Sequence, residues 1–414
     1  MEYGLVGEKL RHSFSKIIHN KLYSAPYELK EIPQNEVKEF MLKRDFKGIN
    51  VTIPYKETVI PFLDVISDNA KQIGAVNTVV NKGGKLYGYN TDFLGLKELI
   101  THNNIEIKGK KVLILGSGGT SKTAKAVAEC LDAKQIFCLS RKGGKGLITY
   151  NEALKNHRDA EIIINTTPCG MYPNIGESAI DISNFPQLEG VVDVVYNPLS
   201  SALVVEARNK KIKAIGGLYM LVSQAVFAAE FFLDTVFDRK KIDEIYKTIE
   251  NEKKNIVLIG MPGVGKTTIG KELAKALDKE FVDTDDEIVK KEAILIPEIF
   301  ATKGEGYFRQ LESEVIKEIS AKQGLVIATG GGAILNSLNI DLLKENGTVY
   351  FLDRNVEDIV ATSDRPLSSN REDLLKRYEE RYPIYLSSAD FKVNCTSDVQ
   401  KNIKEVILLE NSNY

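Results

Sequence analysis

The sequence has few cysteines and almost no excess of charge of either sign. Its four cysteines (Cys130, Cys138, Cys169 and Cys395) are scattered, without a C-x-x-C pair or a histidine cluster beside them. This argues against a disulfide framework or a zinc site and fits a reducing cytosol. The 55 basic and 57 acidic residues leave a formal net charge of −2, so no overall basic field attracts nucleic acid. We therefore expect no nucleic-acid partner.

Long uninterrupted apolar runs are also missing. The first residues, MEYGLVGEKLRHSFS, lack the apolar stretch of a signal peptide. The longest apolar segment, residues 219–237, is interrupted by Gln224, Glu230 and Asp234, which predicts a buried amphipathic helix rather than a membrane span. We expect a cytoplasmic protein that binds no membrane. The sequence gives no indication of its oligomeric state.

What the chain does contain is alternating strand-like and helical segments, over a length of 414 residues that exceeds one ordinary core. This alternation predicts an α/β fold with parallel sheets. Two strands run into glycine-rich turns, at residues 110–121 and 254–268, so each should open its own nucleotide-binding unit. The heavily charged residues 238–255 between them contain no Gly or Pro and predict a solvated, partly helical connector.

The second glycine turn matches the P-loop pattern G-x-x-x-x-G-K-T in full. Its glycines let backbone N–H groups surround a polyphosphate, Lys266 adds a charge beside the β/γ oxygens, and Thr267 can ligate Mg²⁺. The motif alone does not identify the reaction. The predicted ATP-binding residues are Gly260, Gly263, Val264, Gly265, Lys266, Thr267 and Thr268, together with the distant Arg365.

Five segments follow the P-loop in a specific order: FVDTDDEIVKK, IPEIFATKGEGYFRQLESEV, LVIATGGGAIL, ATSDRPLSS and EERYPIYLSSA. Through this order and spacing, residues 255–390 resemble shikimate kinase. The resemblance implies transfer of a phosphoryl group from ATP to shikimate. It also implies a P-loop kinase fold with a parallel sheet.

The resemblance assigns roles to single residues. Asp283 would end a strand and hold Mg²⁺ with Thr267, while Asp285 would point the same way on that strand and act as base or positioner of the attacking hydroxyl. Lys266 and Arg365 would neutralise charge on the transferred phosphoryl group. The shikimate subsite would consist of Asp285, Arg309, Gly330, Gly331, Gly332 and Arg381, in which the arginines clamp the carboxylate.

Two departures from the kinase pattern stand out. The stretch that contains Arg365 looks shorter than the family's lid and lacks a second arginine ahead of Arg365. The family glycine before the IPEIF segment is Ala293 here. The short stretch concerns the lid's role more than the class of reaction.

The first glycine turn, GSGG at residues 116–119, is a variant of the dinucleotide-binding fingerprint, and a glycine turn without a ligand remains an alternative at this point. The next strand ends at IFCLSRK, which puts Ser140, Arg141 and Lys142 where NAD enzymes carry an acid. An acid would bind the ribose 2′-hydroxyl, whereas Arg141 attracts a 2′-phosphate. This favours NADP over NAD.

The segments HSFSKIIHN, GINVTIPYKE, GAVNTVV, YGYNTDFLG, NTTPCGM, VVDVVYNPL and GGLYMLVSQA surround that turn. Through them, residues 2–238 resemble shikimate dehydrogenase. The resemblance implies NADPH-dependent reduction of 3-dehydroshikimate to shikimate, with Lys56 as acid/base and Asp92 as its orienting partner. The implied shikimate-binding residues are Ser13, Ser15, Thr52, Asn77, Tyr196 and Gln224. The implied NADP-binding residues are Gly116, Ser117, Gly118, Gly119, Ser140, Arg141, Lys142, Asn165, Thr166, Met171, Gly217 and Met220.

The two resemblances concern consecutive reactions, since the product of the first is the substrate of the second. They predict a substrate-binding domain at residues 1–100 completed by a helix at 218–237, a Rossmann domain at 101–217, a charged connector at 238–254 and a kinase domain at 255–414. One departure is Gly216, where the dehydrogenase family usually has Asp. Two alternatives stay open: an NAD-dependent quinate/shikimate dehydrogenase, or one catalytic half joined to a shikimate- or nucleotide-binding regulatory module.

Overall fold

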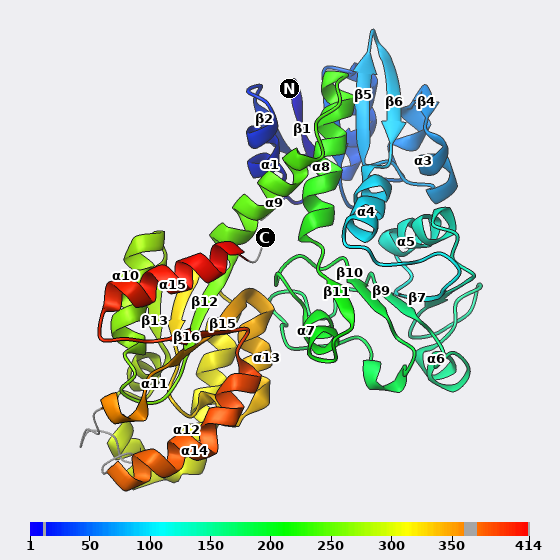
Figure 1. Ribbon diagram of the computed structural model, residues 1–414. Coiled ribbons are helices and arrows are strands. Elements are labelled where there is room, and N and C mark those ends of the chain that lie inside the picture. The colour runs from blue at the N-terminus through cyan, green and yellow to red at the C-terminus, as the bar shows by residue number, and fades with distance from the viewer. Residues whose placement is uncertain (11–13, 360–370, 413–414) are drawn as a thin grey trace. The chain divides into compact units, whose positions relative to one another are not determined.

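The computed structural model describes residues 1–10, 14–359 and 371–412 (Figure 1). Its first sheet is mixed, with the strand order β2-β1-β3-β5-β6-β4. Strands β1 and β3 are buried along their whole length, as expected for apolar strands covered on both faces. The strands are β1 (Tyr3–Gly7), β2 (Tyr27–Glu31), β3 (Gly48–Val51), β4 (Val65–Ile66), β5 (Thr78–Lys82) and β6 (Lys85–Tyr89). The accompanying helices are α1 (Ser15–Leu22), α2 (Val37–Lys43), α3 (Asp68–Ile73) and α4 (Thr91–His102).

The second sheet is entirely parallel and has the order β11-β10-β9-β7-β8. Strand order reverses between β7 and β9, and α/β proteins bind ligands at the carboxyl ends of the strands at such a switch point. The strands are β7 (Lys111–Leu115), β8 (Gln135–Leu139), β9 (Ile162–Asn165), β10 (Gly190–Asp193) and β11 (Lys213–Ile215). The helices of this stretch are α5 (Gly119–Cys130), α6 (Tyr150–Asn156) and α7 (Ala202–Asn209).

Two helices follow the second sheet. Helix α8 (Leu218–Leu233) returns to the first sheet, where its Phe232 stacks on Tyr3 at 5.5 Å. It ends four residues earlier than expected, because Asp234 adopts a left-handed conformation (φ 51°) that closes the helix. Helix α9 (Lys240–Lys253) corrects the expectation of a solvated connector. Its residues Ile242, Ile245 and Ile249 are buried, at the spacing of one helical face.

The third sheet is also parallel, with the order β13-β14-β12-β15-β16. Its strands are β12 (Asn255–Ile259), β13 (Glu280–Asp283), β14 (Leu325–Ala328), β15 (Gly347–Asp353) and β16 (Phe391–Asn394). The helices are α10 (Lys266–Leu277), α11 (Thr284–Glu292), α12 (Ile296–Ser320), α13 (Ser337–Asn346), α14 (Arg371–Ser388) and α15 (Val399–Ser412). Short 3₁₀ helices occur at Gln34–Glu36, Ile60–Phe62, Ile182–Asn184, Ala333–Leu335 and Val356–Asp358. The predicted α/β fold with parallel sheets is confirmed.

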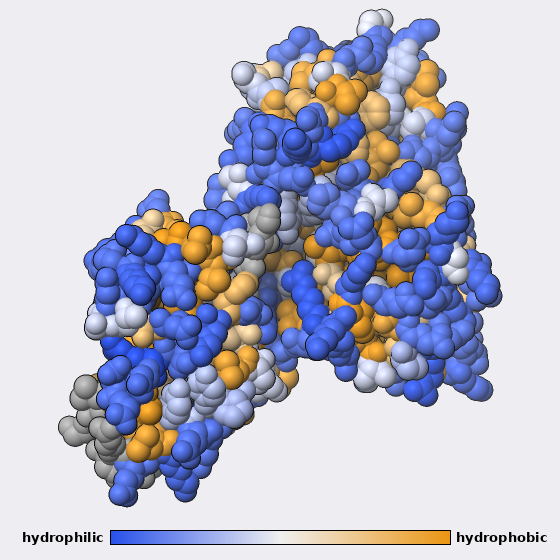
Figure 2. Space-filling view, viewed as in Figure 1, coloured by the Kyte–Doolittle hydropathy of each residue, from blue (hydrophilic) through white to orange (hydrophobic). Residues whose placement is uncertain are grey.

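Contacts divide the chain into two units. Unit 1 comprises Met1–Met171, Glu177–Asn197 and Glu206–Ile249, and unit 2 comprises Tyr172–Gly176, Pro198–Val205 and Glu250–Tyr414. The first two sheets lie in unit 1 and the third in unit 2. Among the described residues, no helix is long and apolar enough to cross a membrane. The face drawn in Figure 2 is mainly hydrophilic, with apolar residues in smaller patches.

Candidate active sites

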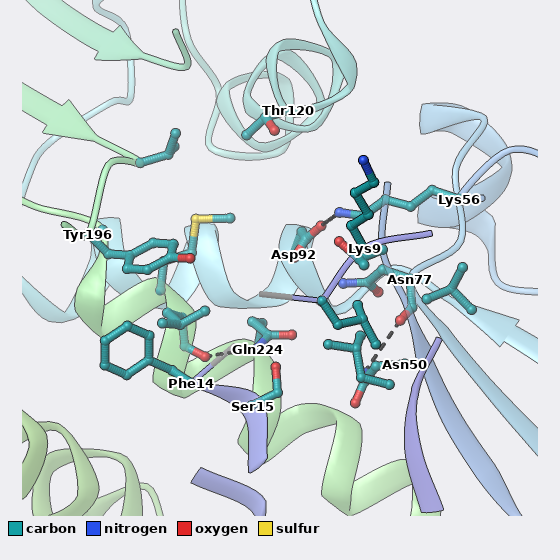
Figure 3. Close-up of a pocket in the computed structure, with 18 residues that line it drawn as sticks. Lys9, Phe14, Ser15, Asn50, Lys56, Asn77, Asp92, Thr120, Tyr196 and Gln224 are labelled. Carbon is teal, nitrogen blue, oxygen red and sulfur yellow. Dashed lines mark hydrogen bonds and ion pairs between the residues drawn. The ribbon is translucent and has the colours of Figure 1, made fainter. Parts of the chain in front are cut away.

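Unit 1 contains a cavity of about 320 Å³ (Figure 3). Its walls come from the first sheet, from the beginnings of α4, α5 and α8, and from the loop after β10. The structure brings together there the following residues of the expected dehydrogenase site: Ser15, Thr52, Lys56, Asn77, Asp92, Tyr196, Gly217, Met220 and Gln224. Ser13 lies outside the described residues.

The central feature of this cavity is an ion pair. Lys56 lies in the turn after β3, and Asp92 lies in the first turn of α4, whose start is capped by Asn90 accepting from the Phe93 N–H. The Lys56 Nζ donates to Asp92 Oδ2 at 2.5 Å, and the two side chains are 29% and 20% exposed. The carboxylate therefore fixes the ammonium group at the cavity wall, where it can give a proton to a bound molecule.

Asn77 presents a fixed set of hydrogen-bonding groups to the same cavity. Its Oδ1 accepts from the Thr91 N–H at 2.7 Å and from the Thr91 and Thr78 hydroxyls at 3.2 Å each. Because the oxygen is used in this way, the amide N–H groups of Asn77 remain to meet acceptor atoms in the cavity. Asn50 supports Thr78 by donating to its hydroxyl at 3.0 Å, and its own Oδ1 accepts from Tyr27.

The remaining wall is partly aromatic and partly amide. Tyr196 packs edge-on against Phe14, with ring centroids 5.7 Å apart, and burial raises the pKa of its hydroxyl. Gln224 donates from Nε2 to the Leu221 carbonyl at 2.9 Å, which leaves its amide oxygen as an acceptor. Gly217 begins α8 so close to β10 that an added Cβ would lie 2.2 Å from the Val194 carbonyl oxygen.

Among the described residues of the cavity, three polar ones were not identified from the sequence: Lys9, Asn50 and Thr120. Asn50 and Thr52 are two positions apart along β3 and the turn after it, so period-two alternation could have identified Asn50. Lys9 follows β1 and Thr120 lies in the first turn of α5, and both carried no motif signal.

The first glycine turn lies at the switch point of the second sheet. Gly116 (φ 115°) follows β7, and an added Cβ would lie 2.7 Å from the Thr166 hydroxyl that follows β9. Ser117, Gly118 and Gly119 are exposed, and the Cβ positions of the two glycines meet open space. A phosphate can therefore approach the backbone at the start of α5.

The other expected cofactor residues are dispersed. Ser140 follows β8 and accepts from the Gly143 N–H at 2.9 Å, whereas the neighbouring Arg141 and Lys142 are exposed. Asn165 is buried, and its amide donates to Asp193 at 3.0 Å, so this side chain holds β9 to β10. Met171 is 44% exposed and is not part of the cavity wall.

Unit 2 carries the P-loop between β12 and α10. Gly260, Gly263 and Gly265 have positive φ values (150°, 88° and 105°), which the tight turn requires and which side chains disfavour. Lys266 is 9% exposed and donates to the Gly260 and Met261 carbonyls at 2.8 and 3.1 Å. The expected residues Val264 and Thr268 belong to the same turn and to the start of α10.

Two oxygen donors meet beside this loop. The Thr267 hydroxyl donates to Asp283 Oδ2 at 2.8 Å, so both groups could contact one cation. Asp285 corrects the expectation of a second strand residue. The strand ends at Asp283, which caps α11 by accepting from the Asp285 N–H at 3.1 Å, so Asp285 occupies the first helical turn.

Asp285 is one of two acids at this site with an unsatisfied carboxylate oxygen among the described residues. Its Oδ1 is buried and has no hydrogen-bond partner among the described residues. Burial, followed by the charge of Asp283, raises its pKa to about 6, and the charge of Lys266 opposes that shift. An acceptor of this kind suits a hydroxyl that must lose its proton.

Three consecutive glycines lie against the other expected residues of the kinase site. A Cβ on Gly330 would lie 2.7 Å from Asp285 Oδ1, and a Cβ on Gly332 would lie 2.2 Å from a guanidinium nitrogen of Arg309. The Gly331 carbonyl accepts from Arg381 at 3.0 Å. The structure therefore brings together Asp285, Arg309, Arg381 and the glycines, while Arg365 and its stretch lie outside the described residues.

Glu312 in α12 was not identified from the sequence. Its Oε2 accepts from Arg309 at 2.9 Å, its Oε1 has no partner among the described residues, and burial raises its pKa. It lies three residues after Arg309 on the same helical face, a spacing that could have indicated the pair.

Comparisons with known proteins find both of the families that the sequence resembles. The family models "Shikimate dehydrogenase substrate binding domain" and "Shikimate kinase" match residues 5–79 and 262–410. The chain is 37% identical to a shikimate dehydrogenase (NADP(+)) of Clostridium perfringens over 266 residues, covering 60% of this chain and 98% of the relative. It is 40% identical to that of Halothermothrix orenii over 254 residues, covering 54% and 88%.

Solved structures give the same result for the dehydrogenase part. A chorismate mutase/shikimate 5-dehydrogenase fusion protein from Clostridium acetobutylicum is similar with a TM-score of 0.57 and 36% identity, covering 60% of this chain and 96% of that chain. Shikimate 5-dehydrogenase from Thermus thermophilus, in complex with NADP(H) and shikimate, is similar with a TM-score of 0.54 and 27% identity, covering 60% and 99%. The chain therefore belongs to the shikimate dehydrogenase family and carries a shikimate kinase domain fused after its dehydrogenase part.

Proposed function

We propose that the chain reduces 3-dehydroshikimate to shikimate with NADPH and then converts shikimate to shikimate 3-phosphate with ATP and Mg²⁺. The observation that carries the first activity is the Lys56–Asp92 pair in a cavity that also holds Asn77 and Gln224. The second activity rests on Asp285, Arg309 and Arg381 around one glycine loop. We also propose a cytoplasmic location and a domain division close to Glu250.

In the dehydrogenase reaction, NADPH supplies a hydride to the ring carbonyl carbon. Lys56 gives its proton to the carbonyl oxygen as negative charge develops there. Asp92 holds the ammonium in place through its hydrogen bond to Lys56. Asn77 donates to ring oxygens, and Ser15, Thr52 and Tyr196 supply hydroxyl groups to the same cavity.

Arg141 and Lys142 support the choice of NADP. They are exposed immediately after β8, where a ribose 2′-phosphate would meet two cations instead of the acid that binds a free hydroxyl. A comparison of NADPH with NADH as reductant tests this. Preference for NADH would favour the alternative of a quinate/shikimate dehydrogenase that uses NAD.

In the kinase reaction, ATP supplies the phosphoryl group. Asp285 accepts the proton of the attacking hydroxyl or orients it, and Arg309 and Arg381 hold the substrate carboxylate. Thr267 and Asp283 are hard oxygen donors of the kind that Mg²⁺ prefers. These two residues would hold the ion beside the phosphates.

A coupled assay tests the combined function. The full chain is supplied with 3-dehydroshikimate, NADPH, ATP and Mg²⁺, and formation of shikimate 3-phosphate is measured. Lys56→Met should slow NADPH oxidation at least about 100-fold and spare phosphorylation of added shikimate. Lys266→Ala should instead impair phosphorylation and spare NADPH oxidation. Loss of both activities in either variant, or absence of one in the unaltered chain, would favour a regulatory role for one half.

A further inference from the structure

The hydroxyl of Tyr385 contacts the glycine loop (Gly330, Gly331 and Gly332) of the kinase site. It donates to the Gly331 carbonyl oxygen at 2.5 Å, the same atom that accepts from Arg381 at 3.0 Å. A carbonyl oxygen has two lone pairs, so these two donors fully occupy it. Arg381 and Tyr385 are four residues apart on α14 and thus lie on one face of that helix.

Tyr385 is held rigidly in this position. It is 1% exposed, and its ring stacks on Phe351 of β15 with centroids 5.0 Å apart and an interplanar angle of 9°. Burial raises the pKa of the Tyr385 hydroxyl, so it remains a proton donor at neutral pH. The tyrosine therefore connects the glycine loop to the central sheet.

The loop that Tyr385 holds is tightly enclosed. A Cβ on Gly331 would lie 2.7 Å from the Pro262 ring in the P-loop, and one on Gly332 would collide with the Arg309 guanidinium. A small displacement of the Gly331 carbonyl would therefore move the guanidinium of Arg381 relative to that of Arg309.

We propose that Tyr385 is a positioning residue for the shikimate carboxylate, acting through the Gly331 carbonyl on Arg381. Arg381 uses one nitrogen to reach that carbonyl, and its guanidinium also interacts with the Tyr385 hydroxyl, so the tyrosine helps to orient the planar fork that would meet a carboxylate. With the tyrosine hydroxyl present, the carbonyl is fixed by two donors and the fork has one orientation. This inference rests on the proposed kinase function.

The test is Tyr385→Phe in the full chain, which removes one oxygen and keeps the ring stacked on Phe351. Kinase activity is measured as ADP formation from ATP and shikimate without NADP, so the dehydrogenase does not turn over. We expect the KM for shikimate to rise about five-fold, the effect of one hydrogen bond of ordinary strength. The kcat, the KM for ATP and the dehydrogenase kinetics should be unchanged.

Two comparisons separate positioning from a general loss of packing. Tyr350→Phe removes another buried tyrosine hydroxyl of the third sheet, one that bonds Glu410, and should leave the KM for shikimate unchanged. Methyl shikimate lacks the carboxylate charge, so Tyr385→Phe should change its KM by less than about two-fold.

The proposal is overturned if Tyr385→Phe leaves the KM for shikimate unchanged, or raises it equally for acid and ester, or equally in both phenylalanine variants. A chain without any kinase activity would instead refute the proposed function, and the inference with it. Because the unaltered chain is assayed first, the two failures are distinguishable.

Discussion

The Lys56–Asp92 pair allows a quantitative prediction for the dehydrogenase. If Lys56 is the proton donor, Lys56→Met should lower kcat by about 10² to 10⁴, the usual contribution of a positioned acid. Asp92 contacts it through a charge-assisted hydrogen bond of 2.5 Å between partly buried side chains. Such bonds contribute about 1.5–3 kcal/mol, so Asp92→Asn should lower kcat/KM by about 10- to 150-fold.

The double variant is decisive, because Asp92 is proposed to act only through Lys56. Once the ammonium is absent, removal of the carboxylate charge should have little further effect, so the double variant should resemble Lys56→Met. Additive losses in the double variant would refute the reasoning. Lys43→Met serves as the matched control, because the Lys43–Glu39 pair has a similar distance of 2.7 Å but is about two-thirds exposed. Initial rates of NADPH oxidation measure all four variants, with kinase activity as the internal check on folding.

Three further predictions concern the kinase acid, the cofactor and a buried histidine. Asp285→Asn should lower kinase kcat at least about 100-fold. At pH 7 the ligand-free variant should nevertheless unfold at a higher temperature than the unaltered chain, because burial raises the pKa of Asp285 to about 6 and its ionised form destabilises the fold. Calorimetry should show the difference between the two unfolding temperatures shrinking below pH 6. Arg141→Ser should raise the KM for NADPH about ten-fold and leave that for NADH unchanged, and an equal rise for both would contradict the 2′-phosphate assignment. Burial lowers the pKa of His19 from 6.5 to about 3, so unit 1 should lose about 1.4 kcal/mol of stability per pH unit as pH falls below 6.5; denaturant unfolding of the unaltered chain and His19→Gln should show this slope only with the histidine.

The sequence predicted which candidate residues come together at both sites better than it predicted their local structure. Lys56, Asp92 and Asn77 lie in separate segments, yet each occurs in a motif, and the structure places all three on one cavity. Asp285 shows the opposite case. The segment DTDD identified Asp285 as a candidate, but the expectation that it lies on the strand with Asp283 was wrong. The carboxylate of Asp283 caps a helix that starts at this point.

Residues that act by supporting others lie within the quoted segments but were not singled out from the sequence. Tyr385 and Asn50 are a buried tyrosine and a buried amide, residue types that usually have packing roles. Only the partners of their polar atoms, the Gly331 carbonyl for Tyr385 and Thr78 with Tyr27 for Asn50, give them a role at a site. Such partners are set by tertiary packing and are absent from any local pattern.

Helix α9 shows how composition can hide an apolar face. Its charged residues suggested a solvated connector, but Ile242, Ile245 and Ile249 repeat at helical spacing and are buried. The Tyr219 hydroxyl donates to Asp243 of α9 at 2.9 Å. Tyr219 lies one residue before Met220, which is part of the cavity wall. Unit 1, which holds the first two sheets, ends at Ile249. Most of α9 thus belongs to the dehydrogenase itself, because it covers apolar surface and contacts the helix that carries Met220 and Gln224.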